Sequence, residues 1–211
     1  KACIVKSEAD EGCLFPELAE TLTERREARK KSLDKRVDVA KKIALKKENC
    51  LIWCDYNNES EALHKAIPQS VEVKGSDKPE HKERAMMGFS NNEVKYLVSK
   101  PSICGFGMNW QNCHEMIFCG LSDSYEQFYQ AIRRCYRFGQ KQQVNVYVII
   151  SEKELNVLNN IKRKQADHER MSKEMIKIMS ENAKVELFNY QKKKTDYLPN
   201  DEMVVPAWLP I

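Results

Sequence analysis

The sequence has few glycines and prolines and no long apolar run. Its 211 residues include seven of each, too few for a β-sandwich or barrel built on many tight turns, or for a disordered tract. No stretch approaches eighteen consecutive apolar residues, which excludes a membrane-spanning helix. The start, residues 1–6, carries neither an initiator Met nor the apolar core of a signal peptide. We therefore expect a piece of a longer polypeptide.

The cysteines are not arranged as metal ligands. None of the eight forms a C-x-x-C pair and no paired His follows at finger spacing, so no metal site is predicted. Several lie inside apolar runs such as 51–54 and 116–119, which is typical of small buried hydrophobes in a reduced, intracellular protein. The even count leaves disulfides open as the alternative. The net charge of +4 neither requires nor excludes nucleic acid.

Residues 16–49 show a charged, helical pattern. Thr21 and Glu24 fit a capping box, although Pro16 could open an earlier helix at its first position. Ser32 is a candidate N-cap for a second helix, whose apolar stripe is formed by Leu33, Val37, Ala40 and Ala44. We predict that the charges solvate outer helix faces. The alternative is a basic, DNA-facing stripe of Arg25, Arg26, Arg29 and Lys30.

Residues 51–150 alternate between short apolar runs and helical stretches. The runs predict strands at 51–54, 71–73, 94–98, 116–119 and 144–150, and the stretches between predict helices at 58–67, 79–89 and 124–137. This order is typical of βαβ units, and hence of an α/β fold with a mostly parallel sheet covered by helices on both faces. Ligands of such sheets bind outside the carboxyl ends of the strands. The loops after Cys54, Val73, Val98 and Cys119 are therefore the expected places for chemistry.

Residues 152–184 predict one long helix or a pair of helices. An apolar stripe at helical spacing is expected to pack against the parent domain, and it comprises Leu155, Leu158, Ile161, Met171, Met175 and Ile178. The tail from Phe188 is predicted to be irregular and docked by Trp208.

Two short segments carry possible chemistry. In Gly105-Phe106-Gly107, after the strand at 94–98, glycines would let the backbone approach a phosphate, although a plain turn is the simpler explanation of these glycines taken alone. Arg134 and Arg137 are three residues apart, so both guanidinium groups are expected on one face of the end of the helix at 124–137. Planar, permanently charged groups suit the oxygens of a transferring phosphoryl group. The alternative is a surface helix whose arginines pair with Asp123 and Glu126.

The segment 130–140, Gln-Ala-Ile-Arg-Arg-Cys-Tyr-Arg-Phe-Gly-Gln, resembles motif VI of superfamily-two helicases, in the form found in Swi/Snf-like DNA translocases. Upstream, 105–109 looks like the end of motif V and 51–56 is similar to motif IV. Residues 73–76 with 82–84 and Phe89 resemble the block between them. The flanking helices look most like those of bacteriophage and prophage members.

The resemblance implies a division into three parts. Residues 51–150 would be the second, RecA-like lobe, 1–50 a charged helical lead-in between the lobes, and 151–211 C-terminal helices with an irregular tail. Two departures bear on the site. Cys104 stands where the family usually has another glycine, and Lys100-Pro101 replaces the common Ser/Thr-bearing start of motif V. Because Pro101 cannot donate a backbone hydrogen bond, contacts to DNA there would differ in detail.

The resemblance also implies roles for particular residues. Arg134 and Arg137 would act as catalytic arginine fingers on ATP and Mg²⁺, and the nucleotide would be bordered by Gly105, Gly107, Asn109 and Gln130. The sequence has no G-x-x-x-x-G-K-[ST] phosphate loop, so ATP would be held mainly by a first lobe and this chain alone should be inactive. DNA phosphates would be met by Tyr56, Asn57, Lys74, Gly75, Ser76 and Lys100.

The expected partners are DNA, bound without regard to sequence, and the first lobe of the same protein, but no membrane. The expected location is intracellular, in the cytoplasm or nucleoid of a bacterial or phage-infected cell. Two alternatives stay open: a non-catalytic RecA-like module for binding or docking, and the lobe of an RNA helicase.

Overall fold

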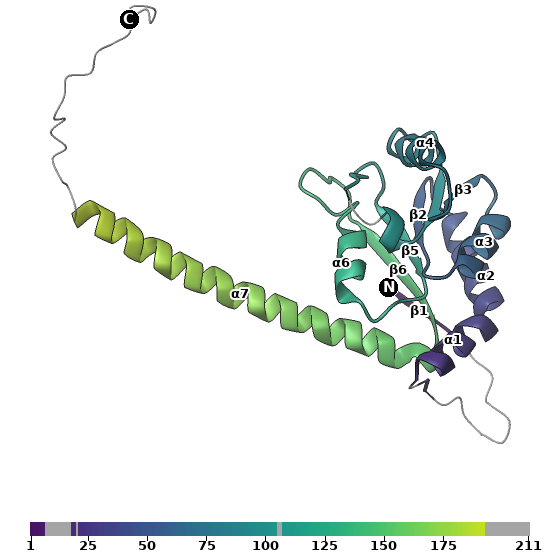
Figure 1. Cartoon of the computed structure of the whole chain (residues 1–211), viewed down its shortest axis with the longest axis horizontal. Coiled ribbons are helices and arrows are strands. Elements are labelled where there is room, and N and C mark those ends of the chain that lie inside the picture. The colour runs from purple at the N-terminus through teal and green to yellow at the C-terminus, as the bar shows by residue number, and fades with distance from the viewer. Residues whose placement is uncertain (7–17, 20, 105–106, 193–211) are drawn as a thin grey trace, which may run out of the picture. The chain divides into compact units, whose positions relative to one another are not determined.

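The computed structural model describes residues 1–6, 18–19, 21–104 and 107–192, with side chains to residue 183. Within these ranges the chain forms one six-stranded sheet in which every pair of neighbouring strands is parallel. The order is β1-β6-β5-β2-β4-β3 (Figure 1). The strands are β1 Ala2–Val5, β2 Cys50–Trp53, β3 Ser70–Val73, β4 Tyr96–Ser99, β5 Glu115–Cys119 and β6 Asn145–Ser151. The predicted parallel α/β sheet is confirmed.

The helices of the described residues follow the expected order. They are α1 Leu22–Lys31, α2 Leu33–Ala44, α3 Asn57–Ala66, α4 Pro79–Ser90, α5 Pro101–Cys104, α6 Tyr125–Ile132 and α7 Leu155–Lys192, with a 3₁₀ turn η1 at Glu152–Glu154. The capping box of α1 is confirmed, because Thr21 Oγ1 accepts from the Glu24 amide and the Glu24 carboxylate accepts from the Thr21 amide. Ser32 stands at the start of α2, but its hydroxyl donates backwards to the Ala28 carbonyl at 2.7 Å.

Helices cover both faces of the sheet, and successive strand residues supply the two cores. On one face, Leu51, Leu97 and Met116 pack with α4, α6 and the first turns of α7. On the other face, Ile52, Val98 and Ile117 pack with α2 and α3. Figure 1 shows α2 and α3 together on one side of the strands and α6 on the other. Each central strand is buried along its whole length, as a doubly covered parallel sheet requires.

The structure differs from the sequence prediction at two elements. β1 was not predicted, because it is a four-residue edge strand that is exposed at Ala2 and Ile4. α6 ends at Ile132 rather than at residue 137. Of the two alternatives for the C-terminal segment, the structure has the single long helix, at Leu155–Lys192. The described residues contain no helix long and apolar enough to cross a bilayer.

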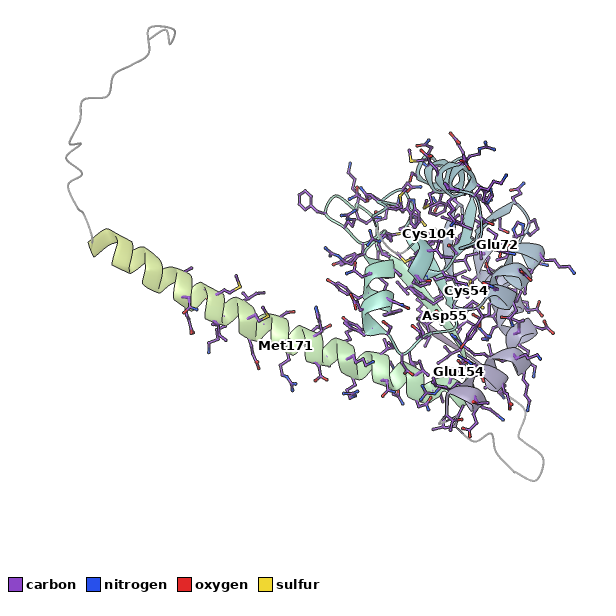
Figure 2. All side chains as sticks on the ribbon, viewed as in Figure 1. Cys54, Asp55, Glu72, Cys104, Glu154 and Met171 are labelled. Carbon is purple, nitrogen blue, oxygen red and sulfur yellow. The ribbon has the colours of Figure 1, made fainter. Side chains whose placement is uncertain are left out.

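The chain divides into compact units at residues 1–165 and 166–211. In the first, Leu158 and Ile161 of α7 are buried in the core. In the second, Met171 (Figure 2), Met175 and Ile178 are 61%, 55% and 56% exposed. These side chains face solvent within their own unit, and the packing of this half of the stripe against the parent domain stays a prediction. Pro16, the tail from residue 193 and its Trp208 lie outside the described residues.

Candidate functional site

Two loops of the predicted motifs lie together at the amino ends of β5 and β6. Residues 107–114 lead into β5, and we term them the glycine loop. Residues 133–140 follow α6 on the way to β6, and we term them the arginine loop. Because β5 and β6 are parallel neighbours, the segments that enter them meet at the amino ends of these two strands. The sequence predicted chemistry at the opposite end of the sheet, where the carboxyl ends of the strands lie.

Hydrogen bonds join the two loops into one platform. The Trp110 amide donates to the Arg134 carbonyl at 2.8 Å, and Arg134 Nη1 donates to the Met108 carbonyl at 3.1 Å. The side-chain amide of Gln111 donates to the Phe138 carbonyl. Gln140 Nε2 lies 3.0 Å from the Gln111 carbonyl oxygen. Main-chain carbonyl groups of both loops are therefore held by donors from the other loop.

The two candidate arginines have different surroundings. Arg134 is only 7% exposed, and besides Met108 it donates to the carbonyl and the side-chain oxygen of Gln130, at 3.2 and 3.3 Å. Burial, and then the positive charge of Arg137, lower the pKa of Arg134. Arg137 is exposed. The expectation that both guanidinium groups project from one helix face is wrong, because α6 ends before either residue.

The alternative pairing of these arginines with acidic residues of α6 and its N-terminus is not seen either. Asp123 pairs with Arg25 of α1 and also accepts from Asn160 at 3.5 Å. Of the two arginines, it is Arg137 that presents its charge to solvent on the platform.

The other residues predicted to border a nucleotide lie on or beside the platform. Gly107 is exposed with φ +83°, a left-handed conformation in which side chains are strained, and no atom lies within 4 Å of where a Cβ would be. Asn109 is exposed, and Gln130 is half-buried against Arg134. Gly105 lies outside the described residues. The structure therefore brings Gly107, Asn109, Gln130, Arg134 and Arg137 together on two adjoining segments.

The residues predicted to meet DNA lie at the other end of the sheet, after the carboxyl ends of β2, β4 and β3. These strands are neighbours, so Tyr56 and Asn57, Lys100, and Lys74–Ser76 follow one another across the sheet. Lys100 Nζ donates to Asn57 Oδ1 at 2.6 Å. Lys74 is less available, because its ammonium group pairs with Glu61 at 2.9 Å and Glu72 at 3.3 Å.

Gly75 and Ser76 are exposed in the turn after β3. The Lys74 amide donates to Asp77 Oδ2 at 2.7 Å, and Lys82 Nζ donates to the Gly75 carbonyl at 2.6 Å. These bonds hold the turn in shape while leaving the Ser76 side chain open to solvent.

A cavity of about 340 Å³ opens at the carboxyl ends of β2 and β5. The chain leaves β2 toward β3 and β4 on one side and returns to β5 and β6 on the other, so this is the switch point at which such sheets form crevices. Its walls carry both signs of charge, including the ion pairs Arg25–Asp123 and Arg29–Asp55. The cavity therefore has no strong preference for anions.

Beneath this cavity lies a buried ion network that the sequence reasoning missed. Arg29 Nη1 lies 2.9 Å from Asp55 Oδ2, and its Nε lies 2.9 Å from Glu154 Oε1 (both acids are labelled in Figure 2). Burial alone would lower the pKa of Arg29, but the charges of Glu59, Asp55 and Glu154 outweigh it and raise that pKa. The prediction that the charges of this segment lie on outer faces is thus wrong for Arg29, and so is the DNA-facing alternative.

Arg36 completes the network. It is fully buried, its Nη2 lies 2.8 Å from Glu59 Oε1, and its Nη1 donates to the Cys119 carbonyl at 3.0 Å. Glu59 in turn accepts from the amides of Asp55 and Tyr56 at 3.1 and 3.2 Å. The network therefore sets the backbone that carries Tyr56. A signal existed in the sequence for Arg36, which lies beside Val37 and one turn before Ala40 on the apolar stripe of α2. Arg29 lies on the separate helix α1 and had no such signal.

Two solved structures share this fold with the chain. The C-terminal part of the Fun30 ATPase domain superimposes with a TM-score of 0.53 at 20% identity, covering 60% of this chain and 44% of that one. The C-terminal domain of the DEAD-box protein Dbp5 superimposes with a TM-score of 0.54 at 13% identity, covering 64% and 80%. These likenesses show the fold, an α/β lobe of the RecA-like type.

The sequence identifies the family. Residues 34–139 match the helicase conserved C-terminal domain, which is about half of the chain, and the chain belongs to this family. It is 29% identical over 154 residues to the bifunctional helicase and thymine dioxygenase JBP2 of Leishmania tarentolae, covering 66% of this chain and 14% of that protein. It is 26% identical over 123 residues to the TATA-binding protein-associated factor mot1 of Schizosaccharomyces pombe, covering 54% and 6%. The chain therefore spans a small part of these relatives.

Proposed function

We propose that the chain is the second motor lobe of an ATP-dependent DNA translocase of the Swi/Snf-like type, of the kind that phages and prophages carry. The observation that supports this most is the exposed Arg137 on a platform whose main-chain carbonyl groups accept hydrogen bonds across the two loops, within a helicase C-terminal domain. A guanidinium group presented in this way suits the charge that develops on a transferring phosphoryl group. The ATP site would be shared with a first lobe of the same protein.

Mg²⁺ and ATP would be held mainly by the first lobe. The platform of this lobe offers the exposed guanidinium group of Arg137 and exposed backbone at Gly107. Bound Mg²⁺ and ATP would supply the polarised γ-phosphate. This chain's part is to place Arg137 against it, with Gln130 and the Gly107–Asn109 turn beside the nucleotide.

The structure suggests separate roles for the two arginines. Arg137 has its guanidinium group free to reach across to a first lobe, and we assign it the role of finger. The guanidinium group of Arg134 donates hydrogen bonds to Met108 and Gln130. In this conformation it therefore links the glycine loop to the arginine loop. A second finger role for Arg134 would require it to leave these three acceptors when the lobes close around ATP.

The loops after the carboxyl ends of β2, β4 and β3 would form part of the DNA track. Tyr56, Asn57, Lys100, Gly75 and Ser76 follow three neighbouring strands, so one strand of DNA could pass over them in order. Contacts of this kind reach phosphates and carry no sequence information. DNA is favoured over RNA because a relative is named for its action on thymine, and because the segment 130–140 resembles the translocase form of motif VI.

The test is ATP hydrolysis by the full-length protein, without nucleic acid, with duplex DNA and with single-stranded RNA. We expect stimulation by duplex DNA of at least tenfold and little by RNA. Stimulation by RNA instead would indicate an RNA helicase lobe. Absence of hydrolysis under all three conditions would favour the docking module.

We further predict that Lys100→Ala weakens binding of duplex DNA by the chain, and that Lys74→Ala has a smaller effect because Lys74 is already paired with Glu61 and Glu72. Each phosphate contact removed should lower the slope of log affinity against log salt by about 1. Fluorescence anisotropy from low to moderate salt measures this slope. Lys95→Ala is the control, since Lys95 is exposed just before β4, at the other end of the strand that Lys100 follows. Equal slopes for Lys100→Ala and Lys95→Ala would contradict the track.

A further inference from the structure

We propose that Gln140 is a positioning residue that acts through Arg137. The inference rests on the proposed function and assigns a separate task to the residue that ends the arginine loop. Arg137 and Phe138 have exposed side chains, and Phe138 is 102% exposed, so side-chain packing does not hold this part of the loop. The loop must be fixed through its backbone and its neighbours.

The side-chain nitrogen of Gln140 lies within hydrogen-bond distance of three backbone carbonyl groups. This atom, Nε2, is 3.0 Å from the Gln111 oxygen, 3.2 Å from that of Cys113 and 3.2 Å from that of Cys135. Two of these acceptors belong to the glycine loop and one to the start of the arginine loop. The amide group therefore joins the base of the arginine loop to the segment beside it.

Gln140 also closes the loop on itself. Its backbone amide donates to the Arg137 carbonyl at 3.1 Å, and its side-chain Oε1 accepts from the backbone amide of Gln142 at 3.0 Å. From the other side, Gln111 donates to the Phe138 carbonyl. The two peptide groups that follow Arg137 are thus held by two glutamines, one from each loop, while the Arg137 side chain is exposed.

The chemistry requires an amide at position 140. An NH₂ group has two hydrogens to share among three carbonyl oxygens, and the remaining oxygen of the amide accepts from Gln142. A carboxylate of the same shape could accept from Gln142 but would turn an acceptor toward three other acceptors. Gly139 has φ +94°, a left-handed conformation in which a side chain is strained, and a Cβ there would only reach van der Waals contact with the side-chain nitrogen of Gln111, at 3.4 Å.

Loss of this hold would misplace Arg137 without removing it. Displacement of a catalytic group by about 1 Å can cost about 100-fold in rate. We expect Gln140→Ala to lower kcat for DNA-stimulated hydrolysis by about 10- to 100-fold in the full-length protein, with the KM for ATP changed less than about twofold. Gln140→Glu should lose at least as much. Gln143→Ala, an exposed glutamine on the same segment, is the matched control and should hydrolyse ATP normally.

A double-mutant cycle separates positioning from a merely structural role. If Gln140 acts through Arg137, adding Gln140→Ala to Arg137→Ala should change the remaining rate by less than about twofold, whereas independent effects would multiply. Single-turnover measurement with excess enzyme makes the slow rates accessible, and thermal unfolding of each variant checks the fold. Multiplicative losses, or a Gln140→Ala loss that appears only in KM, would overturn the inference.

These outcomes are distinct from failure of the proposed function. An unmodified protein without DNA-stimulated hydrolysis would refute the motor lobe itself, and the positioning inference with it. An active protein that loses activity with Arg137→Ala but keeps it with both Gln140 variants would refute the positioning role alone.

Discussion

Replacing Arg137 by Ala in the full-length protein should lower DNA-stimulated ATP hydrolysis by about 10³- to 10⁵-fold, the range expected for loss of an arginine finger. The physical reason is electrostatic. Arg137 is the exposed guanidinium group of a loop whose backbone is tied on both sides, so its charge needs little reorganisation to meet the developing charge of a phosphoryl group. DNA binding should change by less than about twofold, because the residues assigned to DNA follow the opposite ends of the strands.

Steady-state hydrolysis at saturating DNA measures the loss, and Arg133→Ala is the control. Arg133 is also exposed and lies four residues from Arg137, with its guanidinium carbon 6.0 Å from the centre of the Tyr129 ring. The Arg133→Ala substitution therefore removes the same charge from the same region and leaves the proposed finger in place. Turnover near that of the unmodified protein in the Arg137 variant would refute the assignment. Arg134→Ala is less informative, since it also breaks the bonds to Met108 and Gln130.

The parts of the fold that local pattern determines were predictable from the sequence. The buried strands at the centre of the sheet, such as β2 and β5, are short apolar runs, and a parallel sheet needs such runs because both of its faces are covered. β1 could not be found in this way. It is four residues long and exposed at two of them, and it forms only because Ala2–Val5 pairs with Val148–Ser151 at the far end of the chain.

The candidate site was predictable as a set of loops but not in its internal roles. Spacing suggested that Arg134 and Arg137 act alike, whereas the end of α6 at Ile132 turns Arg134 into the protein and Arg137 out of it. This difference depends on the Met108 carbonyl, which the sequence places 26 residues away. The rule that ligands lie at carboxyl ends agrees with the proposed DNA track, whose residues came from the family resemblance. The same rule named the loop after Val98, which leads to Gly107, but it did not place the platform at the amino ends of β5 and β6.

The ion network at Arg29 is the clearest case of tertiary structure overriding a local pattern. On α1 alone Arg29 is one of several charges, but it is 5% exposed and lies among three carboxylates. Its guanidinium group passes over Gly120, where φ is +98° and an added Cβ would overlap it. Through Glu59 and Asp55 the network reaches the backbone of Tyr56, so one buried cation supports both the switch-point cavity and the proposed DNA track.

We therefore expect Arg29→Met to destabilise the chain by about 3–5 kcal/mol, because removing one partner leaves buried carboxylates without their counter-charge. Urea unfolding followed by circular dichroism measures the change, and Arg26→Met, at an exposed position of the same helix, should stay within about 0.5 kcal/mol of the unmodified chain. Gly120→Ala should be destabilising for a separate reason, the clash with the Arg29 side chain and the strain of its positive φ.

The loss in Arg29→Met should also depend on pH, with a sign that follows from Glu154. Burial raises the pKa of Glu154 above its model-compound value of 4.5, and the positive charge of Arg29 opposes that rise. Without Arg29 the folded-state pKa should rise further, so the folded variant binds more protons than the unfolded chain between pH 4.5 and the raised value. Stability then falls as pH increases through that window.

The loss in free energy of unfolding of Arg29→Met relative to the unmodified chain, its deficit, should thus be smaller at the acid end of the window than above it. A deficit that is constant across the window, or an unfolding midpoint equal to that of Arg26→Met, would show that the buried carboxylates do not depend on Arg29.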